Sequence, residues 1–315
     1  MSTIVTVTMN PSLDIASETD LLSPDVKLRC AAPRYDAGGG GINVARAIRL
    51  LGGDALALFP SGGPSGKTIS DILEKEGVRF GTIPIAGSTR ENFHVAERAT
   101  GKQYRFVIEG PALDAEEQEA CLQQIETLRP TPEFLVASGS LPPGVTDNFY
   151  AELAHIARSK EMKLVLDAPG SILRKAAPGA YLLKPSLQEL EEMVGSPLPT
   201  EGVRRDALQT LIGGKFAKVI LLSLGGEGAI LAVEGQSWFL PPIKVPVRST
   251  VGAGDSMVAA MVYSLSRGWS PLDAAKYAVA AATAAVLHSG TQLCRREDVE
   301  RFYAAYSIDA RENAA

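Results

Sequence analysis

The sequence predicts an α/β fold in which a mostly parallel β-sheet is covered by helices on both faces, giving three layers, with a small β-sheet lid attached. Short apolar runs alternate with helical stretches along most of the chain, a pattern typical of parallel sheets. Two more polar segments, at about 11–36 and 90–108, interrupt this alternation and are expected to form the lid. With 315 residues, 45% of them hydrophobic, residues 1–315 are expected to form one large domain.

Seven short runs of β-branched or aliphatic residues are expected to be strands of the large sheet. In chain order they are Ile4–Met9, Ala55–Phe59, Phe134–Ala137, Leu164–Leu166, Tyr181–Leu183, Val219–Leu222 and Ala229–Val233. The clearest helix is predicted over 271–287, where apolar residues recur at steps of three and four. Ser270 can cap this helix, and Pro271 suits its first turn.

The lid is predicted to contain an antiparallel hairpin. Residues 91–97 and 103–108 mix polar and apolar side chains and flank Thr100-Gly101, a turn signal. We expect one face of this hairpin to meet water, unlike the dry strands of the large sheet. The polar stretch 11–36 is expected to join the hairpin in the same small sheet.

Composition and charge exclude several classes of protein. The 31 basic and 36 acidic residues leave a net charge of −5, which argues against a nucleic-acid surface. No apolar run is long enough to span a membrane, and residues 1–10 lack the features of a signal peptide, so we expect a cytoplasmic protein without a membrane partner. The cysteine and histidine spacings do not match a transition-metal site.

The segment Ser249–Ser256 is the strongest candidate for chemistry. Its small residues run directly into an apolar helical stretch, so free N–H groups at the helix start can hold a phosphate. Asp255 lies inside this anion site, where it could accept the proton of a hydroxyl that attacks a phosphoryl group. Asp is also a preferred helix cap, and from this segment alone both interpretations stay open.

Two further clusters suggest a sugar phosphate. The glycines of Gly38–Gly41 allow close backbone approach, and Asn43 offers both a donor and an acceptor for a polyhydroxyl ligand, although a turn without a ligand fits equally. Lys27, Arg29 and Arg90 lie in the expected lid. Together these three cations could bind a substrate phosphate, whereas singly each is an ordinary solvated side chain.

A competing nucleotide motif is present at Ser61–Thr68. It follows a strand, precedes a helix and departs from the P-loop pattern by having Ser61 where the first glycine belongs. Leu164–Asp167 could serve as its magnesium-binding strand. Pro64 removes an N–H group that a phosphate cradle would use, so we favour the other candidates.

Gly38–Ala47 and Ser249–Val262 resemble the two signature motifs of the ribokinase-like, PfkB-type carbohydrate kinase family, in the expected order. The resemblance covers nearly the whole chain and extends to Asn10–Asp14, Lys27–Cys30, Gln103–Val107, Ser138–Gly144 and Ser223–Ala229. It implies a ribokinase-like fold and a phosphotransferase that uses ATP and Mg²⁺. Within the family the chain is most similar to the bacterial 6-phosphofructokinases, which implies transfer to the 1-hydroxyl of fructose 6-phosphate, a glycolytic reaction.

The resemblance assigns a role to each matching residue. Asp255 matches the catalytic base, and the anion hole matches Gly252, Ala253 and Gly254. The residues at the positions where the family contacts the sugar hydroxyls are Asp14, Gly39 and Asn43, with Ser138 nearby. Those at the positions where it binds the sugar phosphate are Lys27, Arg29 and Arg90. Nucleotide contacts match Lys184, Ser223, Gly225, Gly228 and Thr250. The family often holds K⁺ through backbone carbonyls at the positions of Ser249 and Val251.

The chain departs from the family at one nucleotide-binding position. The family usually has Asn-x-x-Glu after the fifth core strand, whereas this chain has Ser186 and Glu189. Glu189 can still orient magnesium-bound water, but Ser186 lacks the amide. A weaker response to magnesium is therefore expected, without loss of the reaction.

Three alternatives concern the substrate and the class of protein. Relatives that act on fructose 1-phosphate or tagatose 6-phosphate typically carry Lys where this chain has Gly40, which favours fructose 6-phosphate. An inactive sugar-phosphate-binding regulator is the non-enzyme alternative, although Asp255 and the anion-hole glycines are intact.

Because the half-apolar hairpin needs cover on its exposed face, we also expect a homodimer formed through the lid, as the resemblance implies.

Overall fold

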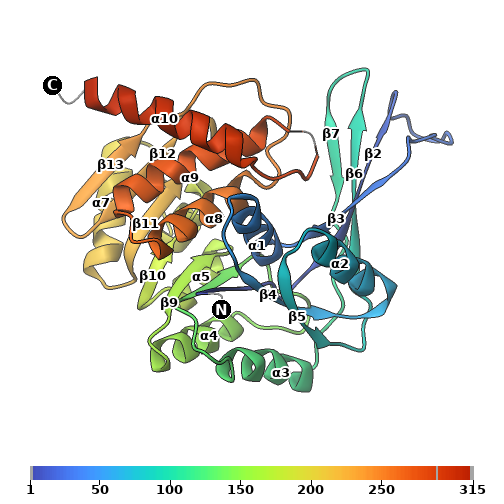
Figure 1. Ribbon diagram of the computed structural model, residues 1–315, viewed down its shortest axis with the longest axis horizontal. Coiled ribbons are helices and arrows are strands. Elements are labelled where there is room, and N and C mark those ends of the chain that lie inside the picture. Colours follow the sequence, from blue (N-terminus) through green and yellow to red (C-terminus); the bar gives the residue numbers. More distant parts are fainter. Residues whose placement is uncertain (1–2, 289, 313–315) are drawn as a thin grey trace.

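The centre of the molecule is a β-sheet whose strands come from much of the chain (Figure 1). The computed structural model describes residues 3–288 and 290–312. Among these residues, nine strands form the sheet in the order β13-β12-β11-β10-β9-β8-β1-β4-β5. Neighbouring strands from β11 to β5 run parallel, while β12 and β13 continue the sheet in antiparallel fashion at one edge.

All seven predicted runs form strands of this sheet, so the predicted mostly parallel sheet is confirmed. The strands are β1 (Ile4–Val7), β4 (Leu56–Ser61), β5 (Arg79–Pro84), β8 (Phe134–Ser138), β9 (Lys163–Asp167), β10 (Ala180–Leu183), β11 (Ala217–Ser223), β12 (Ala229–Val233) and β13 (Gln236–Leu240). Strands β5 and β13 were not predicted. Both are edge strands with several exposed residues, so they lack the continuous apolar runs of the buried strands.

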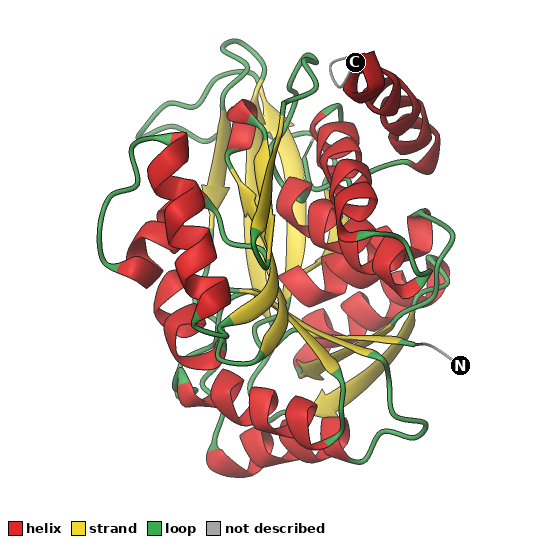
Figure 2. Cartoon of the chain, turned by 90° about the vertical axis from the view of Figure 1, so that its left-hand side faces the viewer, coloured by secondary structure: helices red, strands yellow, loops and turns green. Residues whose placement is uncertain are grey.

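Helices cover both faces of the sheet, as Figure 2 shows. One face packs against α1 (Gly40–Leu50), α2 (Gly63–Lys75), α8 (Ala253–Ser266), α9 (Pro271–Val286) and α10 (Arg296–Glu312). The other packs against α3 (Ala115–Glu126), α4 (Asn148–Ser159), α5 (Gly170–Ala176), α6 (Leu187–Val194) and α7 (Glu201–Gly213). The predicted start of α9 is confirmed, because the Ser270 hydroxyl accepts a hydrogen bond from the N–H of Asp273.

The alternation of side chains along each strand gives the molecule two hydrophobic cores. On β8, Phe134 and Val136 belong to the core beneath α1 and α8, whereas Leu135 and Ala137 belong to the opposite core. All four side chains are fully buried, so the central strands have no polar face. Loops at the carboxyl ends of these strands are therefore held by packing on both sides.

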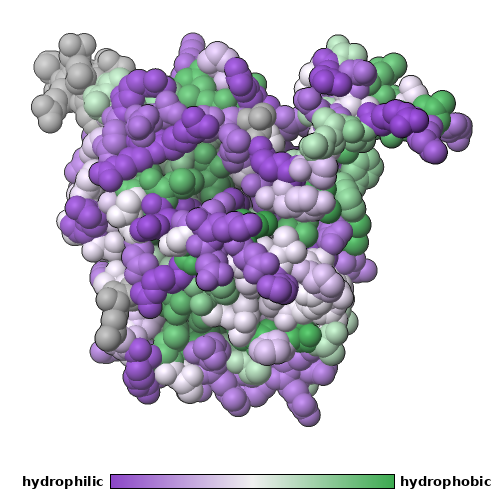
Figure 3. Space-filling view, turned by 45° about the vertical axis from the view of Figure 1, so that its right-hand side comes forward, coloured by the Kyte–Doolittle hydropathy of each residue, from purple (hydrophilic) through white to green (hydrophobic). Residues whose placement is uncertain are grey.

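The lid is a second sheet that projects from the body of the molecule (Figures 1 and 3). Its described strands are β3 (Arg34–Gly38), β2 (Ser12–Thr19), β6 (Arg90–Glu97) and β7 (Gln103–Phe106), in that order. The predicted hairpin is present as the antiparallel pair β6 and β7. The segment 11–36 joins it through β2, which runs parallel to β6.

The two faces of the lid differ in polarity. Asp14, Asn92 and His94 share the face that looks toward the body, because Asp14 is directly opposite Asn92 and the side-chain period along a strand is two. The other face carries aromatic residues that remain exposed, among them Tyr35 and the cross-strand pair Phe93 and Phe106. One face of the lid was expected to meet water, and in the structure this is the outer face with its exposed aromatic residues. An exposed apolar face of this kind could contact a partner.

Within residues 3–288 and 290–312, none of the helices combines the length and the apolar character that crossing a membrane requires.

Candidate active site

Helix α8 begins at a glycine that its surroundings require. Gly252 is the N-cap, with a φ of 74° that L side chains rarely adopt. A Cβ atom there would lie 2.7 Å from the side chain of Leu293, so a side chain would also clash. Among the described residues, the N–H groups of Ala253, Gly254 and Asp255 find no backbone acceptor. These free amides at a helix N-terminus form a site for an anion.

Asp255 lies in the first turn of α8, and its side chain bonds to another helix. Its Oδ2 atom accepts a hydrogen bond of 2.9 Å from the amide of Asn43 in the first part of α1. No side-chain capping bond is present at the start of α8, because Gly252 occupies the N-cap position. The helix-cap interpretation of Asp255 is therefore wrong, and its carboxylate is held beside the free amides instead.

The surroundings of Asp255 make it a better base than an exposed aspartate. Burial raises its pKa to about 7, and the negative charge of Asp167 acts in the same direction. The hydrogen bond from Asn43 and the positive charge of Lys184 oppose this rise. A carboxyl with a pKa near 7 is suited to accept a proton at neutral pH.

A buried ion pair lies beside the same helix N-terminus. The Lys184 Nζ atom is 3.0 Å from Oδ1 of Asp167, and both side chains are largely buried. Burial alone would lower the pKa of Lys184, but Asp167, Glu189 and Asp255 outweigh it and raise that pKa. A Cβ atom on Gly254 would lie 3.8 Å from Nζ, so the ammonium group is close to the free amides.

Asp167 did not enter the predicted site, although it links two residues that did. It accepts a hydrogen bond of 3.2 Å from the Ser138 hydroxyl in addition to its ion pair with Lys184. The signal was present in the sequence, because Asp167 ends a buried strand, as Ser138 does on the neighbouring strand. Polar residues at the carboxyl ends of adjacent parallel strands meet at one edge of the sheet.

The glycines of Gly38–Gly41 allow the start of α1 to contact the sheet directly. A Cβ atom on Gly40 would lie 2.3 Å from the Ser138 hydroxyl, and one on Gly41 would lie 2.5 Å from the carbonyl oxygen of Val7. Gly39, the N-cap, has a φ of 111°. The close approach that these glycines allow is thus to strands β1 and β8, and it brings Asn43 to Asp255.

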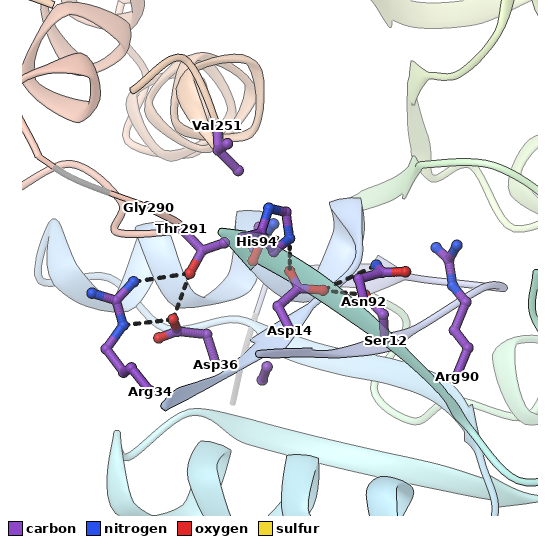
Figure 4. A network of polar contacts seen from close by, with 12 residues as sticks. Ser12, Asp14, Arg34, Asp36, Arg90, Asn92, His94, Val251, Gly290 and Thr291 are labelled. Atoms are coloured by element: carbon purple, nitrogen blue, oxygen red, sulfur yellow. Dashed lines mark hydrogen bonds and ion pairs between the residues drawn. The ribbon is translucent and has the colours of Figure 1, made fainter. Parts of the chain in front are cut away.

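Asp14 is the centre of a polar network on the inner face of the lid (Figure 4). Its Oδ1 accepts hydrogen bonds from Ser12 (2.7 Å) and Asn92 (3.0 Å), and its Oδ2 lies 3.9 Å from Nε2 of His94. Burial lowers the pKa of His94, and Asp14 offsets part of that effect. Ser12 and Asn92, which were not among the predicted site residues, therefore hold Asp14 in place.

The three predicted phosphate-binding cations are not brought together within one chain. Arg90 is opposite Ser12 at the inner end of β2 and donates hydrogen bonds to the carbonyl oxygens of Asn10 and Ile108. Lys27 and Arg29 are exposed in the loop after the far end of the same strand. Eight residues of strand correspond to roughly 25 Å, so only Arg90 lies near the inner end.

A groove of about 490 Å³ opens beside the start of α8. Predicted nucleotide contacts line it, namely Ser223, Gly225, Gly228 and Thr250, together with Ala253 and Gly254. Its remaining walls are mainly apolar and were not predicted, including Val247, Met257 and Val279. Apolar walls next to an anion site fit a ligand with a flat base and a phosphate chain.

Ser186 and Glu189 form a capping box at the start of α6. The N–H of Ser186 donates to Glu189 Oε2 (2.7 Å), and the N–H of Glu189 donates to the Ser186 hydroxyl (3.3 Å). Ser186 thus has a clear structural role where the family usually has Asn. Glu189 Oε1 accepts no hydrogen bond from a described residue, so one carboxylate oxygen lies outside the capping box.

The loop that contains Ser249 and Val251 has free carbonyl oxygens. The Ser249 hydroxyl donates to the carbonyl of Gly290 (2.9 Å) and accepts from the N–H of Val251 (3.2 Å). Among the described residues, no backbone N–H donates to the carbonyl oxygens of Ser249 or Val251. Such carbonyls suit a monovalent cation, whereas no cluster of three His, Cys, Asp or Glu in the described ranges could hold a metal.

The P-loop interpretation of Ser61–Thr68 is wrong. Pro64 lies in the first turn of α2, and Lys67 is on the solvent side of that helix with 76% of its side chain exposed. Lys67 pairs there with Asp71 at 3.0 Å, one turn further along α2. An ion pair on an exposed helix surface leaves this lysine away from the groove and the anion site.

Comparison with known proteins places the chain in one family. The profile of the pfkB family carbohydrate kinases matches residues 7–298. The ATP-dependent 6-phosphofructokinase isozyme 2 of Mycobacterium tuberculosis is 48% identical over 300 residues, covering 95% of this chain and 88% of that protein. The potassium complex of Escherichia coli phosphofructokinase-2 superposes with a TM-score of 0.94 at 39% identity, covering 98% of this chain and 100% of that one.

Two further structures bear on assembly and fold. Phosphofructokinase-2 of E. coli has also been solved as a tetrameric inhibited form, which superposes with a TM-score of 0.92 at 39% identity, covering 98% of this chain and 100% of that one. A ribokinase of Arabidopsis thaliana has a TM-score of 0.75 at 19% identity over 96% of this chain and 99% of that one. The second likeness concerns the fold alone.

Proposed function

We propose that this chain, which belongs to the pfkB family of carbohydrate kinases, transfers the terminal phosphoryl group of ATP to the 1-hydroxyl of fructose 6-phosphate. The family membership and the superpositions confirm the ribokinase-like fold expected from the motifs. The single observation that carries the reaction is the carboxylate of Asp255, bonded to Asn43 and placed beside the free amides of Ala253 and Gly254.

The proposed step is an in-line displacement. The substrate hydroxyl gives its proton to Asp255 as its oxygen bonds to the terminal phosphorus, and the bond from that phosphorus to the bridging oxygen of ADP breaks. Asn43 occupies Oδ2, which leaves Oδ1 for the incoming proton. The amides at the start of α8 and the Lys184 ammonium would stabilise the negative charge on the transferring group.

The sugar would lie between the lid and the body. Asp14, Gly39 and Ser138 would contact its hydroxyls, and the hydrogen bonds that Asp14 accepts from Ser12 and Asn92 fix its carboxylate. Arg90 would bind the substrate phosphate. Because Lys27 and Arg29 lie at the far end of the lid, we propose that a second copy, paired through the apolar lid face, supplies them.

Two ions fit the residues present. Mg²⁺ would bind the phosphates of ATP and neutralise their charge, and Glu189 would hold its water through the free carboxylate oxygen. K⁺ would bind the carbonyl oxygens of Ser249 and Val251, next to the Gly252 turn. The observation in support is that none of these oxygens accepts a hydrogen bond from a described residue.

The structure also bears on which sugar phosphate is used. A side chain at position 40 would clash with Ser138, whose hydroxyl, carbonyl carbon and following N–H all lie within 3.0 Å of a Cβ atom there. The lysine that relatives with other substrates typically carry has no room at Gly40 in this arrangement. This supports fructose 6-phosphate over fructose 1-phosphate and tagatose 6-phosphate.

A substrate panel tests the proposal. Purified protein with MgATP should release ADP fastest with fructose 6-phosphate, when compared with tagatose 6-phosphate, fructose 1-phosphate and ribose at equal concentrations. Faster turnover of another member of the panel would reassign the substrate. Binding of fructose 6-phosphate without ADP release would instead identify a regulator that has lost catalysis.

A further inference from the structure

A cavity of about 330 Å³ lies on the side of α1 that faces β3 and the segment before α10. It shares no lining residue with the nucleotide groove. Its charged lining in the described chain consists of Arg34, Arg46, Arg49 and Arg295 together with the carboxylates Asp36 and Glu76. Four positive charges against two negative ones leave an excess of two positive charges in one cavity.

The two carboxylates of the cavity are paired with its two inner arginines, Arg46 and Arg34. Arg46 is 7% exposed and donates to both oxygens of Glu76, at 2.7 and 2.6 Å, and to the carbonyl of Ala37 at 2.8 Å. Arg34 donates to Asp36 at 2.8 Å and to the hydroxyl of Thr291 at 3.1 Å, as Figure 4 shows. These pairs are structural, and they fix the inner wall of the cavity.

The two outer arginines have no such partner. Neither Arg49 nor Arg295 makes a hydrogen bond or an ion pair with a described side chain, and both are exposed at the rim. The guanidinium group of Arg49 lies beside Gly77, where a Cβ atom would be 3.3 Å from Nη2. The excess positive charge of the cavity therefore belongs to this outer pair, on α1 and on the residue before α10.

We propose that this cavity binds a phosphate group. A phosphate dianion matches the two uncompensated positive charges, and its tetrahedral oxygens suit the planar fork of donors that each guanidinium presents. The cavity is large enough for the group with a small substituent. The same chemistry serves inorganic phosphate and a phosphomonoester, so the experiment includes both.

The site is distinct from the proposed catalytic centre. Its residues include neither Asp255 nor Asn43, nor any residue assigned to sugar or nucleotide. It is nevertheless built on the same elements, because Arg46 and Arg49 follow Asn43 on α1, and Gln292 and Leu293 lie against Gly252. Changes to Arg49 and Arg295 therefore test phosphate binding without altering a residue of the catalytic centre.

Titration calorimetry on the full chain tests the proposal, with inorganic phosphate and glycerol 3-phosphate as separate probes. The double variant Arg49→Gln/Arg295→Gln should bind at least about tenfold more weakly than the unaltered protein, because two charge-assisted contacts are lost. The control is Arg129→Gln/Arg158→Gln, which removes two exposed arginines that bond to backbone carbonyls on the opposite face of the sheet. Its affinity should be unchanged.

Each result has a defined meaning. Tighter binding of glycerol 3-phosphate than of inorganic phosphate would identify a phosphomonoester site, and the reverse would identify a free-phosphate site. Equal affinity of the cavity variant and the unaltered protein, an equal loss in the control, or no binding to the unaltered protein would overturn the proposal. Melting temperatures without ligand show whether both variants fold, and a phosphate-dependent rise in melting temperature provides a second readout.

Discussion

The amide of Asn43 donates a hydrogen bond to Oδ2 of Asp255 across 2.9 Å and so joins the first parts of α1 and α8. The two residues are separated by 212 positions in the chain, and each follows a glycine turn of positive φ. This bond fixes Oδ2 and leaves Oδ1, the oxygen that the proposed proton transfer uses, without a hydrogen bond from a described residue. It also acts on the pKa of Asp255, which determines how well that residue accepts a proton.

Replacing Asp255 with Asn should lower kcat by at least about 100-fold, the usual lower bound for losing a general base, while fructose 6-phosphate still binds. Asp273 provides a matched control, because it is also a carboxylate in the first turn of a helix, but it lies in the exposed start of α9. Asp273→Asn should retain normal turnover. Near-normal turnover of Asp255→Asn would remove Asp255 from the reaction.

Replacing Asn43 with Ala should move the acidic limb of the kcat profile to higher pH. The hydrogen bond from Asn43 lowers the pKa of Asp255, so its loss lets burial raise that pKa above about 7. The measurement is kcat against pH from 5 to 9 at saturating substrates. An unchanged limb, or one displaced toward lower pH, would show that Asp255 does not control it.

The pKa of Asp255 also predicts a dependence of stability on pH. Its folded-state pKa of about 7 lies above the value of 3.8 for an unperturbed aspartate, so the folded state binds the proton more tightly. Stability should therefore fall as pH rises from about 4 to about 7, and the loss is complete above that range. Urea unfolding at pH 8 should show Asp255→Asn to be more stable than the unaltered protein by at least about 1 kcal/mol, with the difference vanishing near pH 3.

Replacing Arg90 with Ala should raise the KM for fructose 6-phosphate at least about tenfold and leave the KM for ATP within about twofold, since a charge-assisted phosphate contact is lost. Arg79→Ala removes an exposed arginine of β5 and serves as the control. Initial rates with each substrate varied in turn give both constants. If the KM for ATP rose instead, Arg90 would belong to the nucleotide site.

Replacing Phe106 with Glu should weaken self-association, because it places a charge on the exposed apolar face of the lid. Phe106 is 52% exposed and lies opposite Phe93. Val203→Glu changes an exposed apolar residue on α7 and should leave the assembly intact. Light scattering measures the mass of each. A monomeric unaltered protein, or equal masses for all three, would show that the lid is not the interface.

The sequence predicted those features that neighbouring residues determine. Short continuous apolar runs located every buried parallel strand, because burial is visible in neighbouring residues. Ser270 and Pro271 located the start of α9, because capping is also a local signal. The edge strands β5 and β13 were missed, since their residues are only partly buried. The ion pair of Asp167 with Lys184 could not be predicted, because it depends on which strands are neighbours.

The same distinction holds for the candidate site. Asp255 and Asn43 were selected from their own glycine-rich segments, but the bond that excludes a capping role for Asp255 joins two distant helices. The raised pKa likewise comes from burial and from the charge of Asp167, which only the fold brings close to Asp255. The separation of Lys27 and Arg29 from Arg90 follows from the pairing of β2 with β6, a long-range property of the fold.

The contact between α1 and the end of β8 limits how this protein could acquire a different sugar preference. A Cβ atom at position 40 would meet the backbone of Ser138 and Gly139 as well as the Ser138 hydroxyl, so trimming one neighbour would not make room. A randomised library at that codon should therefore return glycine. A side chain at position 40 would require the whole helix to shift, carrying Asn43 with it, so such an exchange would need accompanying changes along α1.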